Sequence, residues 1–171
     1  LHNAENALAA VAAARELGID IENIQHALAG LKPVAGRLCP VAGNDGQLLI
    51  DDTYNANPDS VSAAIDVLST APGRKILVLG DLAELGETAF EMHAELGVLA
   101  GSKGVDLLYT CGDLSKAAAE SFNGTAKHFK SRDALIEVLQ HETGSNDYIL
   151  VKGSRSASME QVVKGLGGDA C

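Results

Sequence analysis

Three short apolar segments constrain the fold of this chain more than any other feature. They lie at residues 76–79, 107–110 and 148–151, and none alternates apolar with polar side chains. This pattern is typical of strands that are buried on both faces, as in parallel sheets covered by helices on both sides. Segments of helical periodicity separate the three strands. We therefore predict an α/β protein with a doubly wound, mostly parallel sheet and flanking helices.

The remaining predicted elements follow the same alternation of strand and helix. A weaker strand is predicted at residues 126–129. Residues 38–42 and 47–51 flank the turn sequence Gly43-Asn44-Asp45-Gly46, which favours a hairpin. Helices are predicted around residues 61–68, 88–100, 114–122, 133–140 and 156–165.

The first 34 residues differ from the rest because they contain helical patterns and no strand. Gly18 ends a first, Ala-rich helix, and Asp20 caps a second helix that runs to Gly30. A helix pair of this size buries too little apolar surface to fold alone. We therefore expect residues 1–34 to be the last helices and the linker of a larger, truncated domain.

Composition narrows the possible partners. Acidic residues outnumber basic ones by 23 to 13, the formal net charge is −10, and the bases are scattered. Such a surface disfavours nucleic acid and anionic membranes as partners. No apolar run approaches the ~20 residues that span a bilayer, and the N-terminus has no signal-peptide pattern. We expect a monomeric, cytoplasmic protein without membrane insertion.

Polar side chains gather where three predicted strands end. The clusters are DDTYNAN at residues 51–57, GDLAELG at residues 80–86 and KGSRS at residues 152–156. Ligands of open α/β sheets bind beyond the carboxyl ends of the strands. We therefore expect all three clusters to lie along one edge of the sheet.

Each cluster also has a purely structural interpretation. Asn57 or Asp59 could cap the following helix. Capping does not require the neighbouring acids Asp51 and Asp52, which favours a further role for them. The second cluster could be a tight turn with a solvated Glu84. The third cluster favours an anion site, because two bases precede a predicted helix start.

Five segments occur in an order and spacing that resembles the C-terminal part of the Mur ligases. They are residues 2–10, 36–37, 51–58, 80–86 and 152–155. The resemblance implies a Rossmann-like C-terminal domain at residues 35–171, preceded by the last helices of the central ATPase domain. Within the family, the pattern is similar to ligases that add D-alanyl-D-alanine to UDP-N-acetylmuramoyl-tripeptide during peptidoglycan precursor synthesis.

The resemblance implies ATP-dependent amide-bond formation. In this family ATP converts a peptide carboxylate into an acyl phosphate, which an amine attacks, while Mg²⁺ and cationic side chains neutralise negative charge. The C-terminal domain closes on ATP and supplies the dipeptide site. The phosphate-binding pattern G-x-x-x-x-G-K-[ST] occurs nowhere in this sequence. We therefore expect the isolated chain to be inactive, with no assigned catalytic residue or metal ligand.

The resemblance also assigns residues to an ATP site. Asn3 and Asn6 match adenine-binding asparagines of the central domain, whose amides both donate and accept hydrogen bonds. Arg37 matches a linker arginine that reaches the ATP phosphates, and Asp52 matches an aspartate that accepts hydrogen bonds from the ribose. The complete predicted ATP site is Asn3, Asn6, Arg37, Asp52, Tyr54 and Asn55.

The other two clusters are predicted to hold the D-alanyl-D-alanine substrate. On charge, Lys152 and Arg155 suit its carboxylate. Asp81 or Glu84 suits its amine, and Ser154 lies between the two bases of the third cluster. These five residues form the predicted substrate site.

Two other classes of protein share part of the pattern. A small regulatory α/β module with an acidic pocket at Asp51 and Asp52 would explain the adjacent acids. It would leave Arg37 and residues 152–155 without a role. A dinucleotide-binding module would need G-x-G-x-x-G after a strand, and the sequence contains none.

Overall fold

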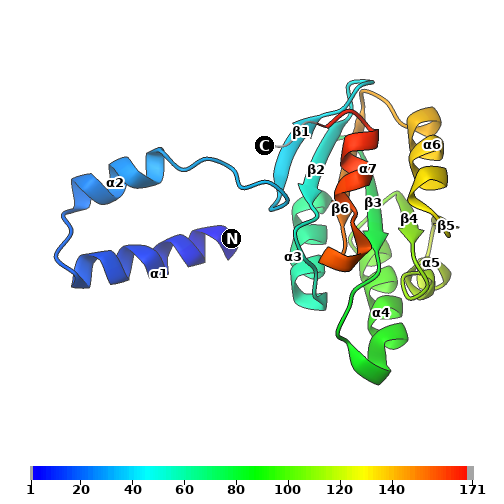
Figure 1. Cartoon of the computed structure of the whole chain (residues 1–171), viewed down its shortest axis with the longest axis horizontal. Helices are drawn as coiled ribbons and strands as arrows, with labels where there is room; N and C mark the ends of the chain where they lie inside the picture. Colours follow the sequence, from blue (N-terminus) through cyan, green and yellow to red (C-terminus); the bar gives the residue numbers. More distant parts are fainter. Residues whose placement is uncertain (1, 169–171) are drawn as a thin grey trace. The chain divides into compact units, whose positions relative to one another are not determined.

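A computed structural model of the protein describes residues 2–168, with side chains from residue 7 onward. The chain divides into two compact units, Leu1–Pro33 and Val34–Cys171. The first unit consists of α1 (His2–Glu16) and α2 (Ile21–Ala29) (Figure 1). As predicted, Asp20 caps α2, and its carboxylate accepts a hydrogen bond from the Asn23 N–H at 2.8 Å.

The second unit contains a six-stranded sheet with the order β1-β2-β6-β3-β4-β5. Only the pairing of β1 with β2, which form the predicted hairpin, is antiparallel. The last strand in sequence therefore lies inside the sheet, between β2 and β3. The strands are β1 (Cys39–Ala42), β2 (Leu48–Asp52), β3 (Arg74–Gly80), β4 (Leu107–Cys111), β5 (Thr125–Phe129) and β6 (Asp147–Lys152).

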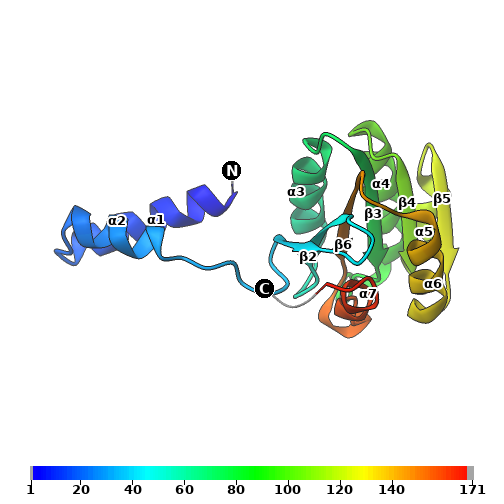
Figure 2. The same cartoon turned by 90° about the horizontal axis from the view of Figure 1, so that it is seen from above.

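Helices cover both faces of the sheet, and each face has its own apolar core. Figure 2 shows α3 (Pro58–Ser69) and α4 (Ala89–Ser102) on one side of the sheet. α5 (Lys116–Ser121) adds Ala118 to the core on that side. α6 (Arg132–Glu142) and α7 (Glu160–Gly165) pack on the opposite face. The predicted doubly wound, mostly parallel α/β sheet is confirmed.

One predicted helix is shorter than expected. The sequence pattern placed a helix at residues 156–165, but α7 begins only at Glu160. A single 3₁₀ turn, η2 (Arg155–Ala157), comes first, and Ser158 then adopts a left-handed conformation with a φ of 50°. A left-handed residue interrupts the helical hydrogen bonding. Consequently, Lys152 precedes this short turn and Arg155 begins it, so neither base lies at the start of a long helix.

Among the described residues, every helix is too short or too polar to cross a bilayer.

An ion pair between a partly exposed arginine and a buried aspartate joins β3 to β6 at the amino ends of these strands. Arg74 Nε and Nη2 each donate to one carboxylate oxygen of Asp147 at 2.6 Å. The Gly144 N–H donates to the same carboxylate at 2.8 Å, and only 4% of Asp147 is exposed. Burial alone would raise the pKa of Asp147, but the hydrogen bonds from Arg74 and Gly144 outweigh it, so the pKa lies below its ordinary value.

We expect Asp147→Asn to lower the free energy of unfolding at pH 7 by about 1–3 kcal/mol, because it leaves Arg74 without its counter-ion. The folded-state pKa is depressed, so the carboxylate stabilises the fold above about pH 4 and this contribution disappears as the pH falls through the folded-state pKa. Urea unfolding at pH 7 and at a series of lower pH values measures the difference between variant and wild type.

The matched control is Asp45→Asn, at an exposed position in the β1–β2 turn. We expect a change within about 0.5 kcal/mol for this variant. A deficit in Asp147→Asn that stays the same at every pH would contradict the assigned contribution of the carboxylate.

Candidate functional site

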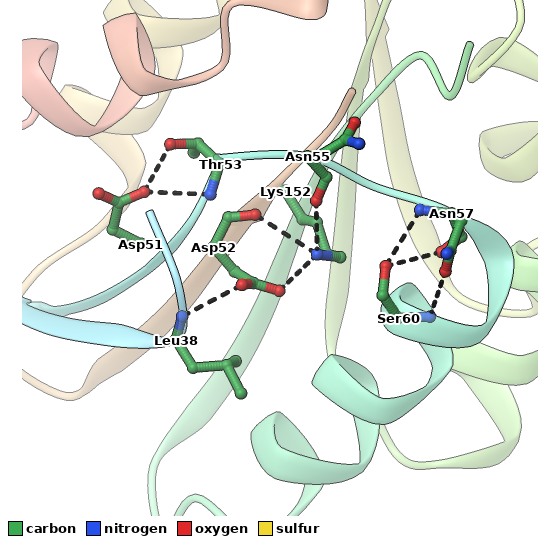
Figure 3. A network of polar contacts seen from close by, with 8 residues as sticks. All are labelled: Leu38, Asp51, Asp52, Thr53, Asn55, Asn57, Ser60 and Lys152. Carbon is green, nitrogen blue, oxygen red and sulfur yellow. Dashed lines mark hydrogen bonds and ion pairs between the residues drawn. The ribbon is translucent and has the colours of Figure 1, made fainter. Parts of the chain in front are cut away.

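The carboxyl ends of β2, β6 and β3 bring the three polar clusters to one edge of the sheet. Asp52 of β2 pairs in register with Lys152 of β6, and Lys152 pairs on its other side with Leu79 of β3. The expectation that the clusters share one edge is therefore confirmed. Figure 3 shows the polar contacts at the end of β2.

Asp51 connects the end of β2 to the segment that precedes the hairpin. Its buried carboxylate accepts hydrogen bonds from the Gly36 N–H at 3.2 Å and from the Thr53 hydroxyl at 2.6 Å. The Tyr54 N–H donates to the Gly36 carbonyl at 3.0 Å. Gly36 has a φ of 72°, and a Cβ there would lie 2.9 Å from Tyr54 N, so this close approach requires glycine.

The carboxylates of both Asp51 and Asp52 are engaged by other groups of the protein. Both carboxylate oxygens of Asp51 accept hydrogen bonds from groups of the protein itself. Asp52 faces the ammonium of Lys152. The adjacent acids therefore do not form the open acidic pocket that a small regulatory module would need.

Asp52 and Lys152 form a buried ion pair. Lys152 Nζ lies 2.5 Å from Asp52 Oδ2 and 3.0 Å from the Asn55 carbonyl oxygen (Figure 3). The other carboxylate oxygen of Asp52 accepts from the Leu38 N–H at 3.1 Å. The Lys152 side chain is 2% exposed and that of Asp52 is 12% exposed. The two residues that the sequence analysis assigned to separate sites are thus direct partners.

Arg37 and Tyr54 lie together on the surface of the same edge. The Arg37 guanidinium carbon is 4.4 Å from the centroid of the Tyr54 ring, within the range of a cation–π contact. Tyr54 is 51% exposed, and Arg37 is also exposed. The arginine is therefore oriented by an aromatic ring while its donors stay open to a ligand.

Asn57 caps α3, which is one of the two capping alternatives that the sequence analysis left open. Its side-chain oxygen accepts from the Ser60 N–H at 2.8 Å, and the Ser60 hydroxyl accepts from the Asn57 N–H at 3.0 Å. This reciprocal pair is a capping box at the start of α3, with Pro58 in its first turn. The loop after β2 is therefore anchored at its far end as well.

The second cluster uses most of its polar groups inside the protein. The Asp81 carboxylate accepts hydrogen bonds from three successive backbone N–H groups, those of Asp113, Leu114 and Ser115, at 2.7–3.0 Å. The Ser154 hydroxyl donates to the Asp81 carbonyl at 2.8 Å and accepts from the Ala83 N–H at 2.6 Å. Asp81 thus positions the loop after β4, and Ser154 ties the loop after β6 to that after β3.

Glu84 and Arg155 remain open to solvent. Glu84 is exposed and adopts a left-handed backbone conformation with a φ of 64°. Arg155 is exposed in η2 and lines a cavity of about 200 Å³ together with Asp51 and Tyr54. Arg155 therefore lines the same hollow as the end of β2.

A second cavity of about 430 Å³ contains cationic residues that the sequence analysis missed. Lys130 and Arg132, which follow β5, line it together with Asp81. Arg132 donates to the Ala157 carbonyl at 3.1 Å and so supports η2. The sequence signal that could have identified this site is the pair of cations that follows residues 126–129, the weakest predicted strand. Burial raises the pKa of the Cys111 thiol in this cavity, which disfavours a nucleophilic thiolate.

Four further predicted site residues are Asn3, Asn6, Asn55 and Lys152. Asn3 and Asn6 lie in α1, in the part whose side chains are outside the described residues. Asn55 meets Lys152 through its backbone carbonyl. The expected contact of Lys152 with a substrate carboxylate is not supported, because its ammonium is buried against Asp52 and Asn55. Among the described side chains, no group of three His, Cys, Asp or Glu residues is arranged to hold a metal ion.

Comparison with known proteins identifies the family. The family model described as "Mur ligase, glutamate ligase domain" matches residues 36–155. UDP-N-acetylmuramoyl-tripeptide--D-alanyl-D-alanine ligase of Escherichia coli (strain K12) is 43% identical over 96% of this chain and 37% of its own length. The ligase of the same name from Bacillus subtilis (strain 168) is 35% identical over 96% of this chain and 38% of its own. The chain thus spans little more than a third of these relatives.

Solved structures agree with this result. A crystal structure of MurF from Acinetobacter baumannii is 36% identical, with a TM-score of 0.85 over 96% of this chain and 37% of that one. A MurF ligase from Thermotoga maritima in complex with ADP is 29% identical, with a TM-score of 0.78 over 91% of this chain and 35% of that one. Since the family model matches most of the sheet and its polar edge, this chain belongs to the Mur ligase family.

Proposed function

We propose that this chain is the C-terminal part of an ATP-dependent ligase that adds D-alanyl-D-alanine to UDP-N-acetylmuramoyl-tripeptide. The observation that carries the proposal is the 43% identity to the Escherichia coli ligase over 96% of the chain. Residues 1–34 would then be the end of a central ATPase domain, and residues 35–171 the C-terminal domain. The cytoplasmic location and the monomeric state stay predictions.

The nucleotide would bind at the end of β2. Each oxygen of the Asp52 carboxylate accepts one hydrogen bond from the protein, so each retains capacity to accept another from a ribose hydroxyl. Arg37 is exposed and would reach the phosphates, with Tyr54 stacked against it. Asn55 would shape this site through its backbone, and Asn3 and Asn6 would contribute from the central domain. The ADP in the Thermotoga maritima ligase supports a nucleotide site in the family.

ATP would supply the phosphoryl group that activates the peptide carboxylate. As the family resemblance implies, Mg²⁺ would be held mainly by the preceding domain. The role of this chain would be to bind and orient substrates with cationic and hydrogen-bonding groups.

The dipeptide would bind near the loops after β3 and β6. Arg155 is the exposed cation of the third cluster and suits the carboxylate of the dipeptide. Glu84 is exposed and suits its amine. Asp81 and Ser154 would support this site mainly by holding its loops together, given the hydrogen bonds that they make.

The proposed function has a direct test. The full-length protein that contains this chain should release ADP only when ATP, UDP-N-acetylmuramoyl-tripeptide and D-alanyl-D-alanine are all present. The isolated 171-residue chain should release none, because its sequence has no phosphate-binding loop. Coupled detection of ADP, with each substrate left out in turn, measures both. Activity of the full-length protein that does not depend on the dipeptide would contradict the proposal.

We expect Asp52→Ala and Arg37→Ala in the full-length protein to raise the KM for ATP about tenfold or more. Each removes a charge-assisted contact worth about 1.5–3 kcal/mol. Steady-state kinetics with varied ATP at saturating dipeptide measure the effect. The control is Lys116→Ala, at an exposed residue of α5 that pairs with Glu120. Wild-type ATP kinetics in both site variants would exclude this edge as the nucleotide site.

We expect Arg155→Ala to raise the KM for D-alanyl-D-alanine far more than the KM for ATP, because it removes the proposed ligand of the dipeptide carboxylate. Separate titrations of the two substrates distinguish three cases. A change within about 0.5 kcal/mol for both would indicate a solvated arginine. A lower kcat at unchanged dipeptide affinity would place Arg155 at the phosphoryl group instead, and equal losses for both substrates would remove the carboxylate assignment.

A further inference from the structure

Lys152 is a fully buried cation at the carboxyl end of an interior strand. Its side chain is 2% exposed, and β6 lies between β2 and β3. A buried ammonium is costly unless it is paired and hydrogen-bonded. The groups that pair with the Lys152 ammonium and accept its hydrogen bonds therefore indicate its role.

The ammonium has three N–H donors, and three acceptors surround it, two on Asp52 at the end of β2 and one in the loop that follows. Nζ lies 2.5 Å from Asp52 Oδ2, 3.0 Å from the Asn55 carbonyl oxygen and 3.5 Å from the Asp52 carbonyl oxygen. A substrate carboxylate could reach Nζ only by displacing one of these groups. Lys152 is therefore not available as a direct ligand in this arrangement.

These contacts determine how Asp52 is presented. Lys152 holds one carboxylate oxygen from β6, and the Leu38 N–H holds the other from the start of the hairpin (Figure 3). Two donors from different parts of the chain thus set the plane of the carboxylate. The side chain of Asp52 is still 12% exposed, so its free lone pairs can meet a ligand.

Lys152 also restrains the loop itself. Its bond to the Asn55 carbonyl holds the middle of the loop, while the capping box of Asn57 and Ser60 holds the end that enters α3. Removing the ammonium would release the carboxylate of Asp52 and the loop backbone together.

We propose that Lys152 is a positioning residue, which orients the Asp52 carboxylate to accept two hydrogen bonds from a vicinal diol. The inference rests on the proposed function, in which that diol is the ribose of ATP. It replaces the expected role of Lys152 as a ligand of the dipeptide. Loss of Lys152 should therefore impair recognition of the ribose hydroxyls specifically.

The test compares ATP with 2′,3′-dideoxy-ATP in the full-length protein. Lys152→Met, which keeps the length of the side chain but removes its charge, should raise the KM for ATP about tenfold. The KM for the dideoxy analogue should change less than about twofold, so that the preference for ATP is lost, and the KM for D-alanyl-D-alanine should stay near wild type. The matched control is Lys103→Met, which removes a surface ion pair with Asp66 and should keep the preference.

Asp52→Asn separates failure of this inference from failure of the proposed nucleotide site. If Asp52→Asn itself keeps the preference for ATP, Asp52 does not bind the ribose. In that case both the proposed nucleotide site and the proposed role of Lys152 are wrong. If Asp52→Asn loses the preference while Lys152→Met keeps it, only the role of Lys152 is overturned. A selective rise in the KM for the dipeptide in Lys152→Met would restore the direct-ligand role and also overturn the inference.

The double variant Asp52→Asn/Lys152→Met covers the case in which Lys152→Met does not fold, because it removes both charges of the buried pair. If Lys152 acts through Asp52, the double variant should have the same constants for ATP and dipeptide as Asp52→Asn alone. A further loss of dipeptide affinity in the double variant would show a direct contact and overturn the inference.

Discussion

The buried ion pair between Lys152 and Asp52 is the interaction on which the polar edge of this domain depends. The two residues are paired in register on the parallel strands β6 and β2. A slip of one residue would turn Asp52 to the other face of the sheet and leave the ammonium of Lys152 buried without its counter-ion. The pair therefore favours one register of β2 against β6. Through the Leu38 N–H, it also connects that register to the start of the β1–β2 hairpin.

The rest of the edge follows the same principle, because many of its polar groups are bound by other groups of the chain. Asp51 holds Gly36, Asp81 holds the loop after β4, and Ser154 links the loops after β3 and β6. What remains exposed is a smaller set that includes Arg37, Tyr54 and Arg155. Such an arrangement suits a binding surface, since fixed loops present a few charged groups with little reorganisation on ligand binding.

The fold was largely predictable because its signals are local. Burial on both faces makes strands such as β3 and β6 continuous apolar runs, and the caps at Asp20 and Asn57 lie next to the helices that they start. The error at residues 156–165 has a local cause as well. Ser158 adopts a left-handed conformation, which is uncommon for serine and is not indicated by the sequence. The pattern therefore predicted a helix that starts too early.

The sequence by itself determined the strands, the hairpin and the place of the three clusters at strand ends. It also showed the resemblance to the family, because the order and spacing of the five motif segments can be read from one sequence. Only the tertiary structure decided which polar groups bind one another. Asp52 and Lys152 are 100 residues apart, and they meet because the last strand inserts between β2 and β3. Strand order depends on how all the apolar faces pack together, so no local pattern of residues reveals which charge a buried lysine will find.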